Sequence, residues 1–300
     1  MPAPGPSTSS GLRRLSELGE FGLLAELERR GLASGLDGEG AVLEDGLAVT
    51  QDLLVEGVHF RLDWTAWRDL GYKAAAVNLS DLAALAAEPI GLLVGLGAPA
   101  ETAEDAIVEI YEGVQEAGVP VLGGDTVAAD ALTLAVVAVG RSERVPGRAG
   151  ARPGDLLVVT GALGASAAGL YALRHGLDGF DELVARHRRP PLRLAEGRAL
   201  GRAAHALIDV SDGILADAGR IAERSGCKLV VEQENVPRAP RIDEVADLPF
   251  WTMGEDYELL AALAPADART SAFAIVGHVE EGSGVEPSEP HGWDAFVLPG

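Results

Sequence analysis

The chain has 300 residues, and its 24 Lys and Arg against 46 Asp and Glu give a formal net charge of −22 at pH 7. The hydrophobic fraction of 47% and the charged fraction of 23% are those of a globular protein, and the length allows two domains with separate cores. An acidic surface repels nucleic-acid phosphates and anionic lipids, so general nucleic-acid binding and membrane binding are largely excluded. The one cysteine, Cys227, cannot form an internal disulfide, which favours a reducing, cytoplasmic location.

The N-terminal part predicts a leader followed by a helix. Residues 1–14 are expected to be flexible, and they lack the basic start and apolar run of a secretory signal. Ser16 and Gly31 then bracket an amphipathic run that predicts a helix, because Ser favours a helix start and Gly a helix end. Later apolar runs, such as 131–140, have the length of strands and are too short to span a membrane.

The rest of the chain alternates between strand-like and helical patterns. In chain order, the first half contains predicted strands at 41–43 and 47–50, a helix at 67–87, a strand at 90–96, a helix at 103–117, and strands at 119–122 and 132–139. The second half contains a strand at 156–160, helices at 166–175 and 192–204, a strand at 207–210, a helix at 212–225, and strands at 228–232, 257–262 and 272–276. A Gly- and Pro-rich stretch between the halves predicts a domain boundary near Arg144. We therefore expect an α/β (α+β) protein with an N-terminal domain at 15–144 and a C-terminal domain at 145–300.

Carboxylates recur at the ends of the predicted apolar strands and within an apolar helix. Four of them lie just after or beside the end of a predicted strand: Asp52, Asp125, Asp209 and Asp212. A fifth, Asp81, lies inside the Ala- and Leu-rich helix, where a buried carboxylate is costly without a cation or hydrogen-bond donors. Because Mg²⁺ prefers such oxygen ligands together with water and phosphate oxygens, the five acids indicate a metal site.

Each of these residues also has an ordinary structural explanation. Asp212 or Ser211 suits a helix N-cap, and Gly123-Gly124-Asp125 suits a tight turn. Asp81 suits the exposed side of its helix, and a lone His59 is more often ordinary than functional. The metal-site hypothesis therefore depends on how many such residues coexist.

Common catalytic and phosphate-binding motifs are absent from the sequence. It has no GxxxxGK[ST] motif and no GxSxG motif, and the glycines of 160–166 lack the lysine of a phosphate-binding loop. Nothing in the sequence supports nucleophilic catalysis. An acidic metal site with Arg148 nearby points instead to phosphoryl transfer, where positioning and charge neutralisation dominate.

Nine motifs extend from about Gly19 to Phe296: GEFGLL, DLLVEGVHF, YKAAAVNLSDLAALAAEP, VLGGDT, GRAGARPGD, HRRPPLRL, IDVSDGI, MGEDYEL and GWDAF. Their order and spacing resemble thiamine-monophosphate kinase, of the superfamily that includes aminoimidazole ribonucleotide synthetase and selenophosphate synthetase. The resemblance implies a PurM-like architecture, with two domains that each contain a mixed or antiparallel sheet covered by helices. It also implies ATP-dependent conversion of thiamine monophosphate to thiamine diphosphate, and a homodimer that pairs the sheets of the N-terminal domains.

The resemblance implies roles for individual residues as well. Several Mg²⁺ ions would bridge the ATP phosphates and a set of protein ligands: Glu39, Thr50, Gln51, Asp52, Asp81, Asp125, Asp209 and Asp212. ATP would contact Tyr111, Gly124, Arg148 and Ser211, and thiamine monophosphate would contact His59, Glu255 and Trp293. The implied catalytic set is Asp52, Asp81, Asp125, Arg148 and Asp209. It needs no protein nucleophile or general base, because the attacking group is a phosphate oxygen that is already ionised.

This chain departs from the family pattern at three places. The family has Gly-Asp-Asp where this chain has Asp37-Gly38-Glu39, so Gly38 replaces one carboxylate, Glu39 is one methylene longer, and Asp37 is a candidate for the displaced carboxylate. Gln51 replaces a Thr, and Met253 replaces a small residue. These changes motivate one alternative, a catalytically impaired nucleotide-binding homologue. A second is another ATP-dependent small-molecule enzyme of the same superfamily. The retained acids and substrate residues favour an active thiamine-monophosphate kinase over both.

Overall fold

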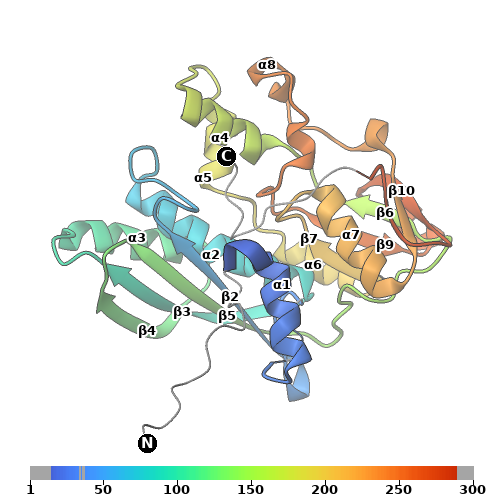
Figure 1. The fold of residues 1–300 in the computed structure, drawn as a ribbon, viewed down its shortest axis with the longest axis horizontal. Coiled ribbons are helices and arrows are strands. Elements are labelled where there is room, and N and C mark those ends of the chain that lie inside the picture. Colours follow the sequence, from blue (N-terminus) through green and yellow to red (C-terminus); the bar gives the residue numbers. More distant parts are fainter. Residues whose placement is uncertain (1–14, 34, 36–37, 289–300) are drawn as a thin grey trace, which may run out of the picture. The chain divides into compact units, whose positions relative to one another are not determined.

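The chain forms two compact units in a computed structural model that describes residues 15–33, 35 and 38–288. The first unit contains residues 1–37 and 293–300, and its described helix is α1 (Leu15–Arg29), which confirms the predicted one. Helix α1 bends at Gly19, whose φ of 66° and ψ of 177° are not helical. The second unit, residues 38–292, contains all other helices and strands of the described residues (Figure 1).

The first sheet of the second unit has the strand order β1-β2-β5-β3-β4. Strands β3 and β4 are parallel, and the other neighbouring pairs are antiparallel. Helix α2 (Trp67–Ala84) packs on one face of this sheet, with α3 (Glu104–Glu116) against it (Figure 1). The strands are β1 (Ala41–Val42), β2 (Leu47–Val55), β3 (Glu88–Ala98), β4 (Val121–Ala128) and β5 (Thr133–Arg141).

The second sheet has the strand order β11-β8-β10-β6-β9-β7, with β11 parallel to β8 and the other neighbouring pairs antiparallel. Helix α7 packs on one of its faces through Ile214 and Ile221. The strands are β6 (Leu156–Val159), β7 (Ala206–Asp209), β8 (Lys228–Val231), β9 (Leu259–Leu263), β10 (Ala274–Glu280) and β11 (Gly284–Glu286). The helices are α4 (Ala165–His175), α5 (Asp181–Arg188), α6 (Leu194–Gly201), α7 (Ile214–Ser225), α8 (Ile242–Val245) and α9 (Pro265–Thr270).

Helix α2 packs against both sheets. Leu79 and Leu82 belong to the core of the first sheet, whereas Ala83 lies in a core with Leu207 and Leu259 of the second. Most of the helix is therefore buried on every side, which explains its Ala- and Leu-rich sequence. This arrangement brings residues near the end of α2 to the junction of the two sheets.

Most predicted elements are confirmed, with shifted ends. Strands β2 and β4 continue through Val55 and Ala128, because their pairing with β5 and β3 continues that far. Asp52 and Asp125 therefore lie inside strands, and the prediction that they follow strand ends is wrong. The sequence analysis also missed α5, although acids in its first turn and bases in its last turn fit the helix dipole.

The predicted boundary near Arg144 falls between β5 and β6, and the division into domains stays a prediction. Within the described ranges, no helix combines the length and apolar character needed to cross a bilayer.

Candidate active site

Three carboxylates meet where α2 approaches the end of β7. Glu39 lies in the bend before β1, Asp81 lies in α2, and Asp209 is the last residue of β7. One oxygen of each carboxylate lies within 4.8 Å of the others. Ser80, beside Asp81, donates from Oγ to Asp209 Oδ2 at 2.6 Å and so ties the helix to the strand. The structure thus brings together three predicted ligands from distant parts of the sequence.

Within the described residues, this carboxylate group lacks a full set of hydrogen-bond donors. Asp209 is 1% exposed, and its Oδ1 has no hydrogen-bond partner among the residues that the structure describes. Burial raises the pKa of Asp209 well above its ordinary value, and the charge of Glu39 raises it further. Burial likewise raises the pKa of Asp81, followed by the charge of Asp52. Since an unpaired carboxylate oxygen is costly away from water, the group fits a divalent cation that takes oxygen ligands.

Strand β2 places Thr50 and Asp52 on the face that α2 covers. Thr50 Oγ1 donates to the backbone oxygen of Asn78 at 3.1 Å, and the Asp52 N–H donates to Asn78 Oδ1 at 2.9 Å. Asn78 therefore joins the strand to the helix; the sequence analysis assigned it no role, although it lies in the NLSDLAA motif. Gln51 is exposed on the opposite face of β2, because side chains alternate along a strand. The structure does not bring its side chain to the carboxylates.

Two arginines lie beside the acidic residues. Arg148 donates to both Glu39 oxygens, from Nε at 2.8 Å and from Nη2 at 2.6 Å, a bidentate pairing that fixes both side chains. Arg220 donates to the Asp212 carboxylate and, at 2.7 Å, to Asp217 Oδ1. Asp217 Oδ2 in turn accepts the Asp212 N–H at 3.1 Å. Arg220 and Asp217 thus hold the Asp212 loop; the sequence analysis missed both, and their three-residue spacing on α7 was the available signal.

Three predicted residues lie away from the carboxylate group. Asp125 is exposed on edge strand β4. The pairing of residues across the sheet aligns Asp125 with Leu53 of β2, and directly aligned side chains lie on the same face. Since Leu53 and Asp52 are adjacent in β2, Asp125 lies on the face opposite to Asp52. Gly124 approaches β3 so closely that an added Cβ would lie 1.9 Å from a backbone oxygen. Tyr111 of α3 lines two shallow depressions of about 300 and 320 Å³.

A second polar cluster surrounds Glu255. The Glu255 N–H donates to the backbone oxygen of Ser211 at 2.7 Å, which joins a predicted substrate residue to a predicted ATP residue. Lys73 Nζ donates to the two Glu255 oxygens at 3.2 and 3.3 Å, and His187 Nδ1 lies 3.3 Å from Oε2. Burial alone would raise the pKa of Glu255, but Lys73 and His187 bring it below its ordinary value. The sequence analysis missed Lys73 and His187, although both lie in motifs that carry the resemblance.

His59 lies within electrostatic range of the same cluster. The Val55 N–H donates to His59 Nδ1 at 3.1 Å, so Nδ1 holds the lone pair and the ring proton is on Nε2. Burial lowers the pKa of His59, and the opposing charges of Glu255 and Lys73 act on it as well. The neutral ring therefore offers an Nε2–H donor. Trp293 and Asp37 lie outside the described residues.

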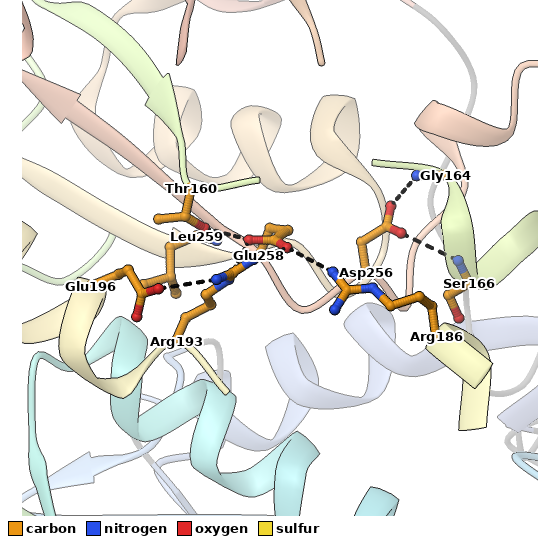
Figure 2. Close-up of polar contacts among 9 residues, drawn as sticks. All are labelled: Thr160, Gly164, Ser166, Arg186, Arg193, Glu196, Asp256, Glu258 and Leu259. Carbon is orange, nitrogen blue, oxygen red and sulfur yellow. Dashed lines mark hydrogen bonds and ion pairs between the residues drawn. The ribbon is translucent and has the colours of Figure 1, made fainter. Parts of the chain in front are cut away.

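The glycine-rich segment 160–166 donates hydrogen bonds to two carboxylates of the chain, Glu258 and Asp256 (Figure 2). Glu258, which is 0% exposed, accepts two hydrogen bonds from Arg193 at 2.6 and 2.7 Å. Asp256 accepts the Gly164 N–H at 2.7 Å, just before α4 begins. These carboxylates take the donors that a phosphate would need, so the segment serves packing and capping.

Asp256 is expected to make stability fall as the pH rises toward neutrality. Burial raises the pKa of Asp256 from 3.8 to about 7, although backbone N–H donors oppose the shift. Between these values the folded protein retains a proton that the unfolded chain has lost. The contribution to stability is therefore complete below pH 3.8 and lost as the pH rises through about 7. At about 1.4 kcal/mol per pKa unit, the change is on the order of 4 kcal/mol at most.

Urea unfolding of the wild type and of Asp256→Asn between about pH 5.5 and about pH 8 isolates this effect. The free energy of unfolding of the wild type should decline relative to that of the variant as the pH rises. A difference that does not change with pH would contradict the assignment.

Known proteins match both halves of the chain. Residues 37–142 match the family model for the AIR synthase related protein, N-terminal domain, and residues 152–286 match that for the C-terminal domain. A thiamine-monophosphate kinase of Aquifex aeolicus is 34% identical, with 94% of this chain and 100% of the relative aligned. One of Mycobacterium tuberculosis is 36% identical, with 95% of this chain and 94% of the relative aligned.

A solved structure, AaThiL complexed with AMPPCP and TMP, is 33% identical and superposes with a TM-score of 0.89 over 95% of this chain and 99% of that one. This match and the two family models confirm the two-sheet, PurM-like fold. The identity over nearly full length also confirms the resemblance stated from the motifs. The chain therefore belongs to the thiamine-monophosphate kinases, a family of phosphotransferase enzymes within the AIR synthase related proteins.

Proposed function

We propose that this protein transfers the γ-phosphoryl group of ATP directly to thiamine monophosphate and forms thiamine diphosphate and ADP. The observation that carries the proposal is the buried Asp209 Oδ1, which lacks a partner among the described residues and lies within the group of Glu39, Asp81 and Asp209. The relatives named thiamine-monophosphate kinase and the AaThiL complex with AMPPCP and TMP support the choice of substrates.

The donor set fits Mg²⁺. Glu39, Asp81 and Asp209 would hold it, with Asp52 and Asp212 as the neighbouring candidates. When bound, Mg²⁺ would neutralise charge on the phosphates and reduce the repulsion between donor and acceptor. The number of ions and the roles of Thr50, Gln51 and Asp125 stay predictions.

The chain's own contribution is to position charged groups. The acceptor is a phosphate oxygen, which is already ionised, so no side chain has to remove a proton. Arg148 sits at the carboxylate group and can exchange its Glu39 contacts for phosphate oxygens, since a guanidinium binds both bidentately. His59 Nε2–H and the Glu255 carboxylate form the polar part of the thiamine site.

Incubation of the purified protein with ATP, Mg²⁺ and thiamine monophosphate tests the proposal. We expect thiamine diphosphate and ADP in equal amounts, and no ADP above background when the acceptor is omitted. ATP binding without product would favour an impaired nucleotide-binding homologue, and ATP turnover with a different acceptor only would favour another enzyme of the superfamily. Label from γ-phosphate-labelled ATP that remains on the protein would contradict direct transfer.

We also propose a homodimer formed through the face of the first sheet opposite to α2. Leu53 and Leu93 are 49% and 39% exposed there, and edge strand β4 exposes Leu122 and Val127 by 58% and 62%. Exposed apolar side chains next to an open strand edge are typical of an interface. Sedimentation equilibrium should give twice the chain mass of 31.0 kDa, and a monomer at all concentrations would refute the dimer. The cytoplasmic location stays a prediction.

A further inference from the structure

Lys73 is a buried cation in a chain that has only two lysines. It is 1% exposed, it lies in α2, and Glu255 is its one hydrogen-bond partner among the residues described. A buried ammonium group is costly unless it is paired, and replacing such a pair by apolar side chains is often neutral or stabilising. The burial of this pair is therefore weak evidence that Lys73 serves stability alone.

The ion pair is open on one side only. The Lys73 and His187 side chains are 2% and 4% exposed, whereas the Glu255 side chain is 31% exposed. The two nitrogen-bearing groups thus lie behind the carboxylate, and part of the carboxylate remains accessible. Glu258 provides the contrast within the same loop region, because its carboxylate is 0% exposed and closed on all sides by its partners.

The backbone at Glu255 is held in an unfavourable conformation. Its φ of 62° is in the left-handed region, which costs a residue with a side chain on the order of 1 kcal/mol. The hydrogen bond from its N–H to Ser211 at 2.7 Å maintains this conformation. A strained backbone that presents one accessible carboxylate edge is typical of a ligand-binding position.

We propose that Lys73 is a positioning residue for thiamine monophosphate. From the buried side, its ammonium group holds the Glu255 carboxylate in the orientation in which the exposed edge accepts a hydrogen bond from the amino group of that substrate or attracts its thiazolium cation. This inference rests on the proposed function. Within the described residues, the Lys73 and Glu255 side chains form no hydrogen bond or ion pair with Glu39, Asp81 or Asp209. The link to Ser211 runs through the Glu255 backbone, which a substitution of Lys73 leaves in place, so we expect the effect on thiamine monophosphate and not on ATP. Lys73 therefore acts on one of the two substrates.

The variant Lys73→Met keeps the length of the side chain and removes its charge. We expect the KM for thiamine monophosphate to rise about tenfold or more, while the KM for ATP and kcat change by less than about threefold. Calorimetric titration of thiamine monophosphate in the presence of Mg²⁺ and AMPPCP should show the same loss of affinity. The matched control is Lys228→Met, which removes the other lysine from a partly exposed ion pair on β8 and should leave both KM values unchanged.

A double-variant comparison separates positioning from a direct or purely structural role. If Lys73 acts through the carboxylate, adding Lys73→Met to Glu255→Gln should raise the KM for thiamine monophosphate by less than about twofold beyond Glu255→Gln alone. The comparison of Glu255→Gln with the double variant still tests the positioning role if Lys73→Met alone fails to fold, because the double variant leaves neither Lys73 nor Glu255 as an unpaired charge. An additive tenfold rise, or equal rises in both KM values, would overturn the inference. A wild type that does not phosphorylate thiamine monophosphate would overturn the function itself, and the inference with it.

Discussion

Asp209→Asn is expected to lower kcat for thiamine diphosphate formation by about a thousandfold or more while the protein remains folded. Asn has the same shape, but it removes the negative charge from the most buried member of the carboxylate group. Losses of this size are typical when a group that stabilises transition-state charge is removed, and Asp209 would contribute by holding the cation that does so. Without Mg²⁺, the variant should be at least as stable as the wild type, because burial already raises the pKa of Asp209 and disfavours its charge.

Thermal unfolding with and without Mg²⁺ gives an independent measurement. Mg²⁺ with AMPPCP should stabilise the wild type and stabilise Asp209→Asn much less, since a ligand that binds only the folded state raises its apparent stability. The control is Asp243→Asn, an exposed acid on α8 whose change should affect neither measurement. Turnover by Asp209→Asn above about a tenth of the wild-type rate would contradict the metal role.

Site residues could be predicted from the sequence where their immediate neighbours already indicate burial. Asp81 was selected because an acid within an Ala- and Leu-rich helix conflicts with its surroundings, and the structure places it in the carboxylate group. That inference needed only the helix itself, because α2 is apolar on nearly every side. Asp209 was selected on a different basis, because it flanks the end of a short apolar strand, and it is the last residue of β7.

The ends of β2 and β4 and the contacts between residues far apart in the sequence could not be predicted from immediate neighbours. Asp52 and Asp125 were expected after strand ends, but cross-strand pairing with segments far away in the sequence carries β2 and β4 past them. The pairing of Lys73 with Glu255 joins residues 182 positions apart, so neither sequence neighbourhood reveals it. A lysine within an apolar helix was the one available indication, in a chain whose basic residues are nearly all Arg.

The net charge of −22 has a more specific meaning once the acids are placed. Part of the negative charge converges on a buried group that fits a cation, and part is neutralised by internal arginines, as at Glu39 and Glu258. On the proposed function, two phosphorylated substrates bind at one place in a protein whose acidic surface repels phosphates in general. That place lies at the end of β7, where Arg148 adjoins the group of Glu39, Asp81 and Asp209.

Arg193→Met is expected to lower the free energy of unfolding by about 3 kcal/mol, which is a large effect for one side chain. Arg193 donates two hydrogen bonds to Glu258, whose carboxylate is 0% exposed (Figure 2). Its removal leaves a buried charge with only Thr160 Oγ1 at 2.7 Å and Arg186 Nη2 at 3.2 Å. The loss of stability should be read from urea unfolding followed by circular dichroism.

Two further variants show whether the loss arises from the buried charge. Arg193→Met combined with Glu258→Gln should recover part of the stability, because the double variant no longer buries an underpaired carboxylate. Arg241→Met removes an ion pair with Glu244 whose side chains are 50% and 58% exposed, and a hydrogen bond to the Gly179 backbone oxygen. Because water can replace these contacts, its effect should stay well below that of Arg193→Met. Equal effects of Arg193→Met and Arg241→Met would show that Glu258 is solvated in solution. The ion pair in Figure 2 would then contribute no more than a surface pair does.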